Sequence, residues 1–393
     1  MRQAERAAII LTGATGFLGG HLMAALLERG DRVVVLGRAS EGRSLADRIA
    51  GHLAWFGLSA RGDQVETAEA DLRQPRCGLA EDRYRALCAR AGPVVHCASD
   101  TRFSERRRQE ITETNVHGLR RILDLAADSR TPFFHYVSTA YVAGKTSGRC
   151  PEELVACGDF ANVYEETKAH AEREVAARCQ RDGLPYSIIR PSIVYGDSRS
   201  GRSTRFNALY HPVKSLAILR EIYLNDLASQ GGEKARACGI ALERGGVLRL
   251  PLRVFVGRRG HLNLIPIDYF VSAVECILER AEAGAIYHLT SDSPITLGDL
   301  AGYCQSFLKI AGIEIIEGSS GETPLNPPEA LFQKFLEPYL PYLADARSFD
   351  RRHANRATCG LKPPEFSYDI FERCMSYAIS VSWGVDRGSY RAA

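Results

Sequence analysis

Residues 7–38 read AAIILTGATGFLGGHLMAALLERGDRVVVLGR, and this stretch decides the fold. An apolar run breaks into four glycines within eight residues, continues as an amphipathic segment, and gives way to a second apolar run after Gly30. Such apolar runs are typical of buried strands, and the segment between them has the length of a helix. The stretch therefore predicts a strand over 7–12, a helix over 17–29 and a strand over 32–36.

The glycines after the first strand indicate a binding site. Gly13, Gly16 and Gly19 follow the strand and open the helix. In such a turn one glycine permits the sharp bend, the next lets a pyrophosphate touch the backbone, and the third lets helix and strand pack closely. The pyrophosphate then rests on unpaired N–H groups at the positive end of the helix dipole. The motif predicts that a dinucleotide binds at this turn.

The end of the second strand indicates which dinucleotide binds. Sites for NAD usually place Asp or Glu there, about 20 residues after the glycines, to hold the ribose 2′-hydroxyl. Here the strand ends in Leu36, Gly37 and Arg38, so a small residue and a positive charge leave room for a 2′-phosphate. Arg48, ten residues further on, is expected to reach the same phosphate from the next helix. We therefore expect NADP, with NADPH as the reduced form.

Short apolar runs alternate with helical patterns over the first two thirds of the chain. Further strands are expected at 65–70, 93–99, 132–139, 185–191 and 284–291. Strands that are apolar on both faces, each followed by a helix, predict an α/β fold with a Rossmann-type doubly wound parallel sheet. We expect residues 1–197 to form the NADP-binding domain, with its sheet completed by about 262–292. Residues 198–261 and 293–393 are expected to form a smaller, mainly helical substrate-binding lobe.

Composition argues against several classes of function. The 393 residues are 45% apolar and 25% charged, which is typical of a soluble globular protein, and no apolar run approaches the roughly 20 residues that span a bilayer. The formal charge of +3 gives no case for a nucleic-acid partner. Eleven cysteines without a CxxC pair indicate free thiols in a reducing cytosol, and the ten histidines show no metal-ligand spacing. We expect a cytoplasmic protein without a transmembrane segment, an export signal or a bound metal.

A tyrosine and a lysine in NVYEETKAHAE, residues 162–172, suggest the chemistry. Tyr164 and Lys168 are four residues apart on a helical pattern and so share one face. An ammonium beside a phenol stabilises the phenolate, and we expect it to lower the pKa of Tyr164 towards working pH. Ser138 and Thr139 end the fifth strand, at the sheet edge where ligands of α/β proteins bind. A hydroxyl there can hold the reacting oxygen beside the tyrosine.

Together these motifs resemble those of the extended short-chain dehydrogenase/reductases, and most of all the branch of thioester-reductase domains and fatty acyl-CoA reductases. The similarity extends over nearly the whole chain. Blocks that resemble successive blocks of that branch are TGATGFLGGHL (12–22), VLGRASEGRSLADRIAGHLAWFGL (35–58), ADLRQPRCGL (70–79), VVHCASDTRFS (94–104), TNVHGLRRILDLA (114–126), FHYVSTAYVAG (134–144), YEETKAHAE (164–172) and SIIRPSIVYG (187–196). A looser similarity to acyl reductase C-terminal regions is found in ARSFDRRHANRAT (346–358).

The resemblance implies a role for residues along the whole cofactor. Beside the pyrophosphate it places Thr15, Gly16, Phe17 and Leu18. At the 2′-phosphate it places Arg38 and Arg48. At the adenine it places Asp71 and Leu72, and beneath the adenosine ribose Cys97, Ala98 and Ser99. Flanking the nicotinamide it places Pro191, Ser192 and Ile193, with Ser138 as a further cofactor contact.

The resemblance also implies the catalytic residues and the reaction. Thr139, Tyr164 and Lys168 would be catalytic, Lys168 would also bond the nicotinamide ribose, and Asn115 would steady the site through water. The reaction implied is hydride transfer from NADPH to an acyl thioester carried by an acyl carrier protein or coenzyme A. The product would be an aldehyde or an alcohol, in lipid or natural-product biosynthesis. About a dozen residues precede the glycine turn, so we expect any carrier or adenylation domain to be a separate protein.

Some features differ from the family pattern or fit other functions. Cys97-Ala98-Ser99 stands where the family commonly has Asn-Ala-Ala, which affects the contacts expected there. An extended-family ketone or hydroxysteroid-type reductase, or an epimerase, shares these motifs, whereas Ala140 and Tyr141 lack the carboxylate that sugar dehydratases need. A non-catalytic NADPH-sensing protein would typically lack the tyrosine or the lysine. Arg199, Arg202 and Arg205 form a loop that we hypothesise to meet a phosphopantetheine arm or an acidic carrier protein.

Overall fold

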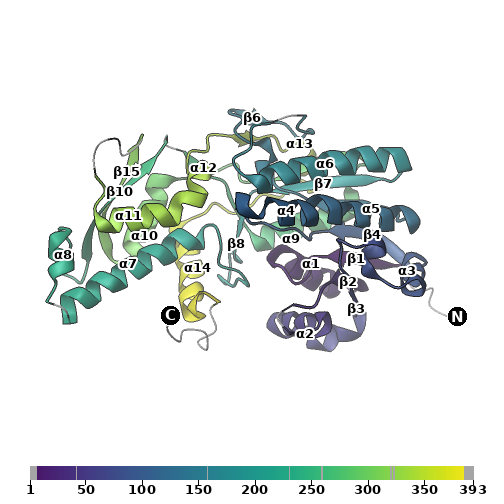
Figure 1. Cartoon of the computed structure of the whole chain (residues 1–393), viewed down its shortest axis with the longest axis horizontal. Helices are drawn as coiled ribbons and strands as arrows, with labels where there is room; N and C mark the ends of the chain where they lie inside the picture. Colours follow the sequence, from purple (N-terminus) through teal and green to yellow (C-terminus); the bar gives the residue numbers. More distant parts are fainter. Residues whose placement is uncertain are drawn as a thin grey trace. The chain divides into compact units, whose positions relative to one another are not determined.

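A computed structural model describes residues 7–40, 42–156, 158–229, 231–257, 260–318, 321 and 324–384 (Figure 1). The chain divides into two compact units. Unit 1 comprises Met1–Ser192, Ile267–Thr290 and Arg347–Lys362, and unit 2 comprises Ile193–Pro266, Ser291–Ala346 and Pro363–Ala393. Each unit is therefore built from three separate segments of the sequence.

Unit 1 is organised around a seven-stranded sheet in the order β13-β7-β5-β4-β1-β2-β3, with every neighbouring pair parallel. The strands are β1 (Ala8–Thr12), β2 (Val33–Gly37), β3 (Val65–Glu69), β4 (Ala91–His96), β5 (Phe134–Val137), β7 (Tyr186–Pro191) and β13 (Ala285–Leu289). The strand order reverses between β1 and β4, so the carboxyl ends of these two strands form the switch point at which α/β sheets bind ligands. The predicted Rossmann-type sheet is confirmed.

The helices of unit 1 cover the sheet through apolar faces. They are α1 (Phe17–Glu28), α2 (Leu45–Phe56), α3 (Glu81–Cys88), α4 (Arg108–Thr112), α5 (Gly118–Asp128), α6 (Val163–Asp182), α9 (Ile267–Arg280) and α13 (Arg352–Ala357). Shorter turns are η1 (Ser59–Gln64), η2 (Pro75–Gly78), η3 (Glu105–Arg107) and η5 (Ala140–Ala143). One core joins Ile10, Val94 and Ile188 of the strands to Ile122 and Val175 of α5 and α6. Burying both faces of the strands explains why they read as continuous apolar runs.

The sequence of residues 106–127 has a helical pattern, but the helix is interrupted in the structure. This region forms α4 and α5 with a π-helical turn between them, η4 (Glu113–His117). A π turn adds a residue to the helical repeat and so rotates the side chains that follow it. The turn contains Asn115, which is 2% exposed.

The segment Arg347–Lys362 lies in unit 1, whereas the sequence analysis placed all of 293–393 in the second lobe. Its strand β16 (Ser348–Phe349) pairs in parallel with β6 (Arg149–Cys150). The carboxylate of Glu152 accepts backbone N–H groups from His288 of β13 and from Ala354 of α13, at 2.9 and 3.1 Å. These long-range bonds hold the segment on unit 1, and local sequence patterns do not reveal them.

Unit 2 is mainly helical, as predicted, and contains a small sheet. Its helices are α7 (Tyr210–Ser229), α8 (Glu233–Ala237), α10 (Leu297–Leu308), α11 (Pro327–Leu336), α12 (Leu340–Leu343), α14 (Tyr368–Ser380) and the short turns η6 (Glu337–Tyr339) and η7 (Ser382–Gly384). Its strands are β8 (Ile193–Tyr195), β9 (Ala241–Leu242), β10 (Leu248–Val256), β11 (His261–Leu262), β12 (Leu264–Pro266), β14 (Ile295–Thr296) and β15 (Ile310–Glu317). The strand β15 pairs with β10 in a region where mostly helical sequence was expected. Among the described residues, no helix combines the length and apolar character needed to cross a bilayer.

Candidate active site

Two glycines of the turn after β1 are required by the packing of the protein itself. Gly13 has φ +79°, and a Cβ added there would lie 2.7 Å from the backbone nitrogen of Ala98. A Cβ on Gly19 would lie 2.3 Å from the carbonyl oxygen of Gly13. Side-chain carbons do not approach backbone atoms so closely. The turn approaches the end of β4 closely, and α1 approaches the turn closely. These two contacts explain why positions 13 and 19 are both glycine.

Packing within the protein gives less reason for a glycine at position 16. A Cβ there would meet the Gly13 carbonyl oxygen at 3.2 Å, a milder conflict. Gly16 precedes α1, the helix starts without a side-chain cap, and its first turn has no acidic residue. The N–H groups at this helix start suit an anion, so the turn fits a pyrophosphate. Thr15, Phe17 and Leu18, predicted to line the pyrophosphate, are half-buried in the same turn.

The end of β2 carries the predicted 2′-phosphate residues. Arg38 directly follows β2 and is exposed, and no described carboxylate forms an ion pair with its guanidinium. Arg48, on α2, donates from Nη1 to the Arg38 carbonyl oxygen at 2.9 Å. The sequence analysis did not consider Glu69, which pairs in register with Gly37. Its carboxylate accepts the backbone N–H of Leu45 at 3.0 Å, so it already serves the start of α2.

The predicted adenine residues follow β3. Asp71 accepts three hydrogen bonds from Arg73, from the backbone N–H at 3.1 Å, from Nε at 2.9 Å and from Nη2 at 2.8 Å. This hydrogen bonding, opposed by burial and aided by the charges of Arg73 and Arg38, holds the pKa of Asp71 below its ordinary value. Asp71 is therefore an ionised acceptor at neutral pH. Leu72 is next to it in the same half-buried turn.

The end of β4 is tied to β1 at the switch point of the sheet. Cys97 and Ala98 donate their backbone N–H groups to Thr12 Oγ1 at 3.2 and 3.1 Å. Thr12 Oγ1 also lies 2.8 Å from His96 Nδ1. Because this oxygen already accepts two N–H groups, the Thr12 hydroxyl donates its proton to His96 Nδ1. Burial, with the charge of Lys168, lowers the pKa of His96 to about 3, so this histidine is neutral.

Asn115 links the end of β4 to α6. Its Oδ1 accepts from the Asp100 backbone N–H at 2.7 Å and from Ser99 Oγ at 3.0 Å. Its Nδ2 donates to the Asp100 carbonyl at 2.9 Å and to Thr167 Oγ1 at 3.1 Å. Both ends of the amide therefore bind protein groups directly. Asn115 lies in the π turn η4. Its side chain links Thr167, the residue before Lys168, to the loop that follows β4.

The predicted catalytic residues meet at the end of β5. Tyr164 and Lys168 lie one turn apart on α6, which begins at the side-chain cap of Asn162. The side chain of Thr139 is close enough to the phenol of Tyr164 to lower its pKa, and Thr139 Oγ1 accepts the Tyr141 backbone N–H at 3.3 Å. Lys168 Nζ donates to the Val137 carbonyl oxygen at 2.8 Å. The structure thus brings the three residues together, from a strand end and a helix.

The pKa of Tyr164 moves opposite to the predicted direction. Burial raises it above its ordinary value, and the Thr139 hydrogen bond only partly offsets this. The expected lowering by Lys168 is not seen. The Lys168 ammonium is held by Val137 and lies 4.7 Å from the centroid of the Tyr136 ring. Burial lowers the pKa of Lys168 to about 8, with Cys97 and Glu172 acting in the opposite direction. At neutral pH Tyr164 therefore keeps its proton.

Three buried hydroxyls end neighbouring strands without a hydrogen-bond partner among the described residues: Ser138 Oγ after β5, Ser192 Oγ after β7 and Thr290 Oγ1 after β13. A buried hydroxyl without a partner costs about 1–3 kcal/mol. A polar ligand at this edge, such as a nicotinamide carboxamide, would satisfy such groups. Ser138 and Ser192 were predicted cofactor contacts, whereas Thr290 was missed. Its signal is a polar residue near the carboxyl end of the strand predicted at 284–291.

Most of the predicted site residues therefore lie at the carboxyl ends of consecutive strands in one sheet, while Arg48 lies on α2 and Tyr164 and Lys168 lie on α6. Their roles remain predictions. Pro191 ends β7, and Ile193 is the one predicted residue that belongs to unit 2. Within the described part of the chain, no group of three or more His, Cys, Asp or Glu residues could hold a metal ion.

Comparisons with known proteins agree with this geometry. The nonribosomal peptide synthetase asaC of Aspergillus flavus is 31% identical over 216 residues, which cover 51% of this chain and 21% of that protein. The chain thus spans about a fifth of the length of this relative. The crystal structure of the terminal R domain from the myxalamid PKS-NRPS biosynthetic pathway matches with a TM-score of 0.72 and 24% identity, over 98% of this chain and 93% of that one.

A second solved structure is the thiolation-reductase di-domain of an archaeal non-ribosomal peptide synthetase. It matches with a TM-score of 0.69 and 16% identity, over 97% of this chain and 77% of that one. At these identities the two structures establish the fold. Residues 11–274, about two thirds of the chain, match the NAD-binding family model described as male sterility protein. The chain therefore belongs to the male sterility protein family, within the extended short-chain dehydrogenase/reductases that use a nicotinamide dinucleotide.

Proposed function

We propose that the chain is an NADPH-dependent reductase of an acyl thioester bound to a carrier protein or coenzyme A. The observation that carries the proposal is the grouping of Thr139, Tyr164 and Lys168, the last two one helical turn apart, at the carboxyl edge of a dinucleotide-binding sheet. The relatives named above as a peptide synthetase, a terminal R domain and a thiolation-reductase di-domain support a carrier-bound substrate in natural-product biosynthesis.

The residues present fit a nicotinamide dinucleotide. The turn at Gly16 would receive its pyrophosphate, and the hydroxyls of Ser138 and Ser192 would bond its nicotinamide end. When bound, the dinucleotide supplies the hydride that is added to the carbonyl carbon of the substrate. Exposed Arg38, without a carboxylate partner among the described residues, supports NADPH as the form that binds.

The chain's own residues would stabilise the negative charge that develops on the carbonyl oxygen. Thr139 Oγ1 accepts from Tyr141, so its own proton stays available as a donor beside Tyr164. The Tyr164 proton is then left for the substrate oxygen, and the raised pKa keeps it in place at neutral pH. The Lys168 ammonium, with donors beyond the one bound to Val137, would hold the nicotinamide ribose.

After hydride addition the carbon–sulfur bond breaks, the thiolate takes up a proton and leaves as a thiol, and an aldehyde is released. A second hydride transfer, to the aldehyde, would give the alcohol, with the same hydrogen bonds to the carbonyl oxygen. A buried tyrosine that retains its proton suits both steps, because each places negative charge on oxygen.

Substrate binding is assigned to unit 2, since the predicted cofactor residues other than Ile193 belong to unit 1. Its loop from Asp197 is held by the Asp197 carboxylate, which accepts the backbone N–H groups of Arg199 and Ser200 at 3.1 and 2.7 Å. We assign the arginines of this loop to the phosphate of a phosphopantetheine arm or to an acidic carrier protein.

The test offers the protein acyl groups on a carrier protein and on coenzyme A, beside ketones, with NADPH or NADH. The expected result is NADPH consumption with the thioesters, and an aldehyde or alcohol identified by mass spectrometry. Turnover of ketones alone would overturn the thioester assignment. A Tyr164→Phe variant that binds NADPH is the matched control, because it removes the proposed proton donor and keeps the ring.

A further inference from the structure

The catalytic face of α6 extends one turn beyond Lys168. Tyr164, Lys168 and Glu172 are spaced by four residues and so lie on one side of the helix. Glu172 is 1% exposed, although it carries no role in the proposed chemistry. A carboxylate so deeply buried requires a charged or hydrogen-bonding partner. The partner is in the sheet.

Glu172 is bound by one edge of a guanidinium, through two hydrogen bonds. Arg190 donates from Nε to Glu172 Oε1 at 2.8 Å and from Nη2 to Oε2 at 2.5 Å. The side chain of Arg190 is 2% exposed, so the pair is excluded from water. Two parallel hydrogen bonds fix the direction as well as the distance between the groups. Arg190 lies on β7 directly before Pro191 and Ser192, the residues predicted to flank the nicotinamide.

The rest of the Arg190 guanidinium is also held in place. Its Nη2 donates to the Glu153 carbonyl oxygen at 2.9 Å, and its Nη1 lies 3.1 Å from Nε2 of His288, its register partner on β13. His288 Nδ1 lies 2.8 Å from the Asp350 carbonyl oxygen, which can only accept, so Nδ1 carries the proton and Nε2 accepts from Arg190. Burial and the charge of Arg190 lower the pKa of His288 to about 3. Among the described residues, Glu172 is the sole carboxylate that forms an ion pair with this guanidinium.

We propose that Glu172 and Arg190 are a positioning pair, which fixes the α6 face bearing Tyr164 and Lys168 relative to the β7 end bearing Pro191 and Ser192. The inference rests on the proposed function, because it concerns the geometry of hydride transfer. The pair joins the element that holds the proton donor to the element expected to hold the nicotinamide. A displacement of about 1 Å in such an arrangement lowers turnover by about 100-fold.

A second consequence concerns the charge on Lys168. The titratable groups around its ammonium are Glu172 on the same helix face, Cys97 and neutral His96 at the end of β4, and the Tyr136 ring of β5 at 4.7 Å. Tyr164 precedes Lys168 by one turn. Glu172 favours the protonated lysine, and Cys97 does so too, while burial opposes both. Removing the Glu172 charge should therefore let Lys168 lose its proton at lower pH.

Two substitutions separate geometry from charge. Arg190→Lys keeps the positive charge and loses the two-pronged hydrogen bond. We expect kcat to fall about 10-fold or more, with the Kd for NADPH within about threefold of wild type and the alkaline limb of the pH profile unmoved. Glu172→Gln keeps the size and loses the charge, and we expect that limb to move to lower pH. Wild-type kcat in the first variant, or a wild-type pH profile in the second, would overturn the proposal.

Since Glu172→Gln leaves a buried guanidinium, the double variant Glu172→Gln/Arg190→Gln tests the same pair without an isolated charge. The double variant should bind NADPH and should turn over at least about 10-fold more slowly than the wild-type protein. A wild-type rate would count against the proposal. Glu81→Gln, on the surface of α3, is the matched control and should change neither kcat nor the pH profile. The rates are measured on whichever carbonyl substrate the wild-type protein reduces, and the pH dependence of the NADPH Kd is followed in parallel. Failure of wild type on thioesters would thus count against the function, and unchanged variants against the pair.

Discussion

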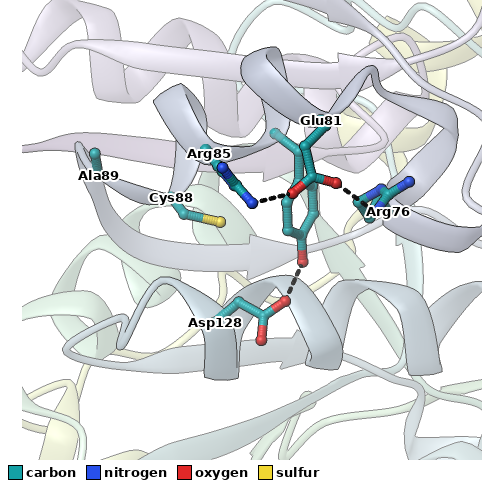
Figure 2. A pocket seen from close by; sticks show the side chains of 7 residues that line it. Arg76, Glu81, Arg85, Cys88, Ala89 and Asp128 are labelled. Atoms are coloured by element: carbon teal, nitrogen blue, oxygen red, sulfur yellow. Dashed lines mark hydrogen bonds and ion pairs between the residues drawn. The ribbon is translucent and has the colours of Figure 1, made fainter.

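Two helices of unit 1 each carry polar side chains spaced four residues apart, and the two rows differ in burial. On α3, Glu81 binds Arg85 at 2.7 Å and Arg76 at 2.5 Å, and Figure 2 shows both guanidiniums turned towards one carboxylate at a surface pocket. On α6, Glu172 binds Arg190 at 2.5 Å. The shortest distances are equal, but the Glu81 side chain is 47% exposed and that of Glu172 is 1% exposed.

Exposure, and not distance, decides what these ion pairs do. An exposed pair gains about 0–1 kcal/mol, since water solvates both charges nearly as well. A buried pair gains little over an apolar replacement, yet losing one partner costs about 3–5 kcal/mol because a charge is left without water. The α3 row is therefore expendable, whereas each member of the α6 row depends on its neighbours. The predictions below follow the α6 row first and the exposed charges last.

The largest effect is expected at Tyr164. In Tyr164→Phe the ring remains and the proposed proton donor is lost, so we expect kcat to fall by about 10²–10⁴-fold with little change in NADPH binding. Steady-state rates and fluorescence titration with NADPH measure the two quantities. Turnover within about threefold of wild type would show that the α6 row, like the α3 row, takes no part in catalysis.

The second effect separates the two rows by stability. Glu172→Ala should lower the free energy of unfolding by about 3–5 kcal/mol, because Arg190 is left buried without its partner. Glu81→Ala should lower it by about 1 kcal/mol or less, because Arg76 and Arg85 are solvated. Urea denaturation at pH 7 measures both values. Equal losses in the two variants would remove burial as the explanation of the difference.

The third effect is a pH dependence that only a buried cation shows. The pKa of Lys168 is lowered by burial to about 8, so its ammonium is lost as pH rises past that value. We expect the rate to fall about tenfold per pH unit above this pKa. In the unfolded chain Lys168 keeps its proton to a higher pH. Between the two pKa values the unfolded state therefore binds more protons than the folded state, and the contribution of Lys168 to stability rises with pH. Rates and denaturation curves from pH 6 to 10 test both, and a flat rate profile would contradict the assignment.

Much of the fold follows from local patterns. The strands β1, β2, β4, β5 and β7 bury both faces, so their sequences are continuous apolar runs and were placed within a few residues. Gly13 and Gly19 are required by close backbone packing, which leaves a visible trace in the sequence. Thr139, Tyr164 and Lys168 were predicted from the strand end, the four-residue spacing and the family resemblance; the structure brings them together, and their catalytic roles stay predictions.

The remaining features depend on contacts between distant residues. Arg190 stands in an apolar strand, where a charge indicates a buried partner, but the sequence does not say that the partner is Glu172. The segment that contains Asp350 packs on unit 1 through bonds to residues about 200 positions away, such as Arg149. The pKa direction of Tyr164 was predicted wrongly because burial, which dominates it, is a property of the folded chain.

The smallest effect concerns an exposed charge whose partner is a ligand. Arg38 is exposed like Arg76 and Arg85 but forms no ion pair with a described carboxylate, so Arg38→Ala should leave the free energy of unfolding within about 0.5 kcal/mol of wild type. A 2′-phosphate placed beside it would gain a charge-assisted hydrogen bond, so we expect the Kd for NADPH to rise about tenfold and that for NADH to stay constant. Raising the salt concentration should reduce the difference between the wild-type protein and the variant, because the site is open to water. Titration of both proteins with both dinucleotides measures this preference, and an equal loss of NADH binding would place Arg38 at another part of the cofactor.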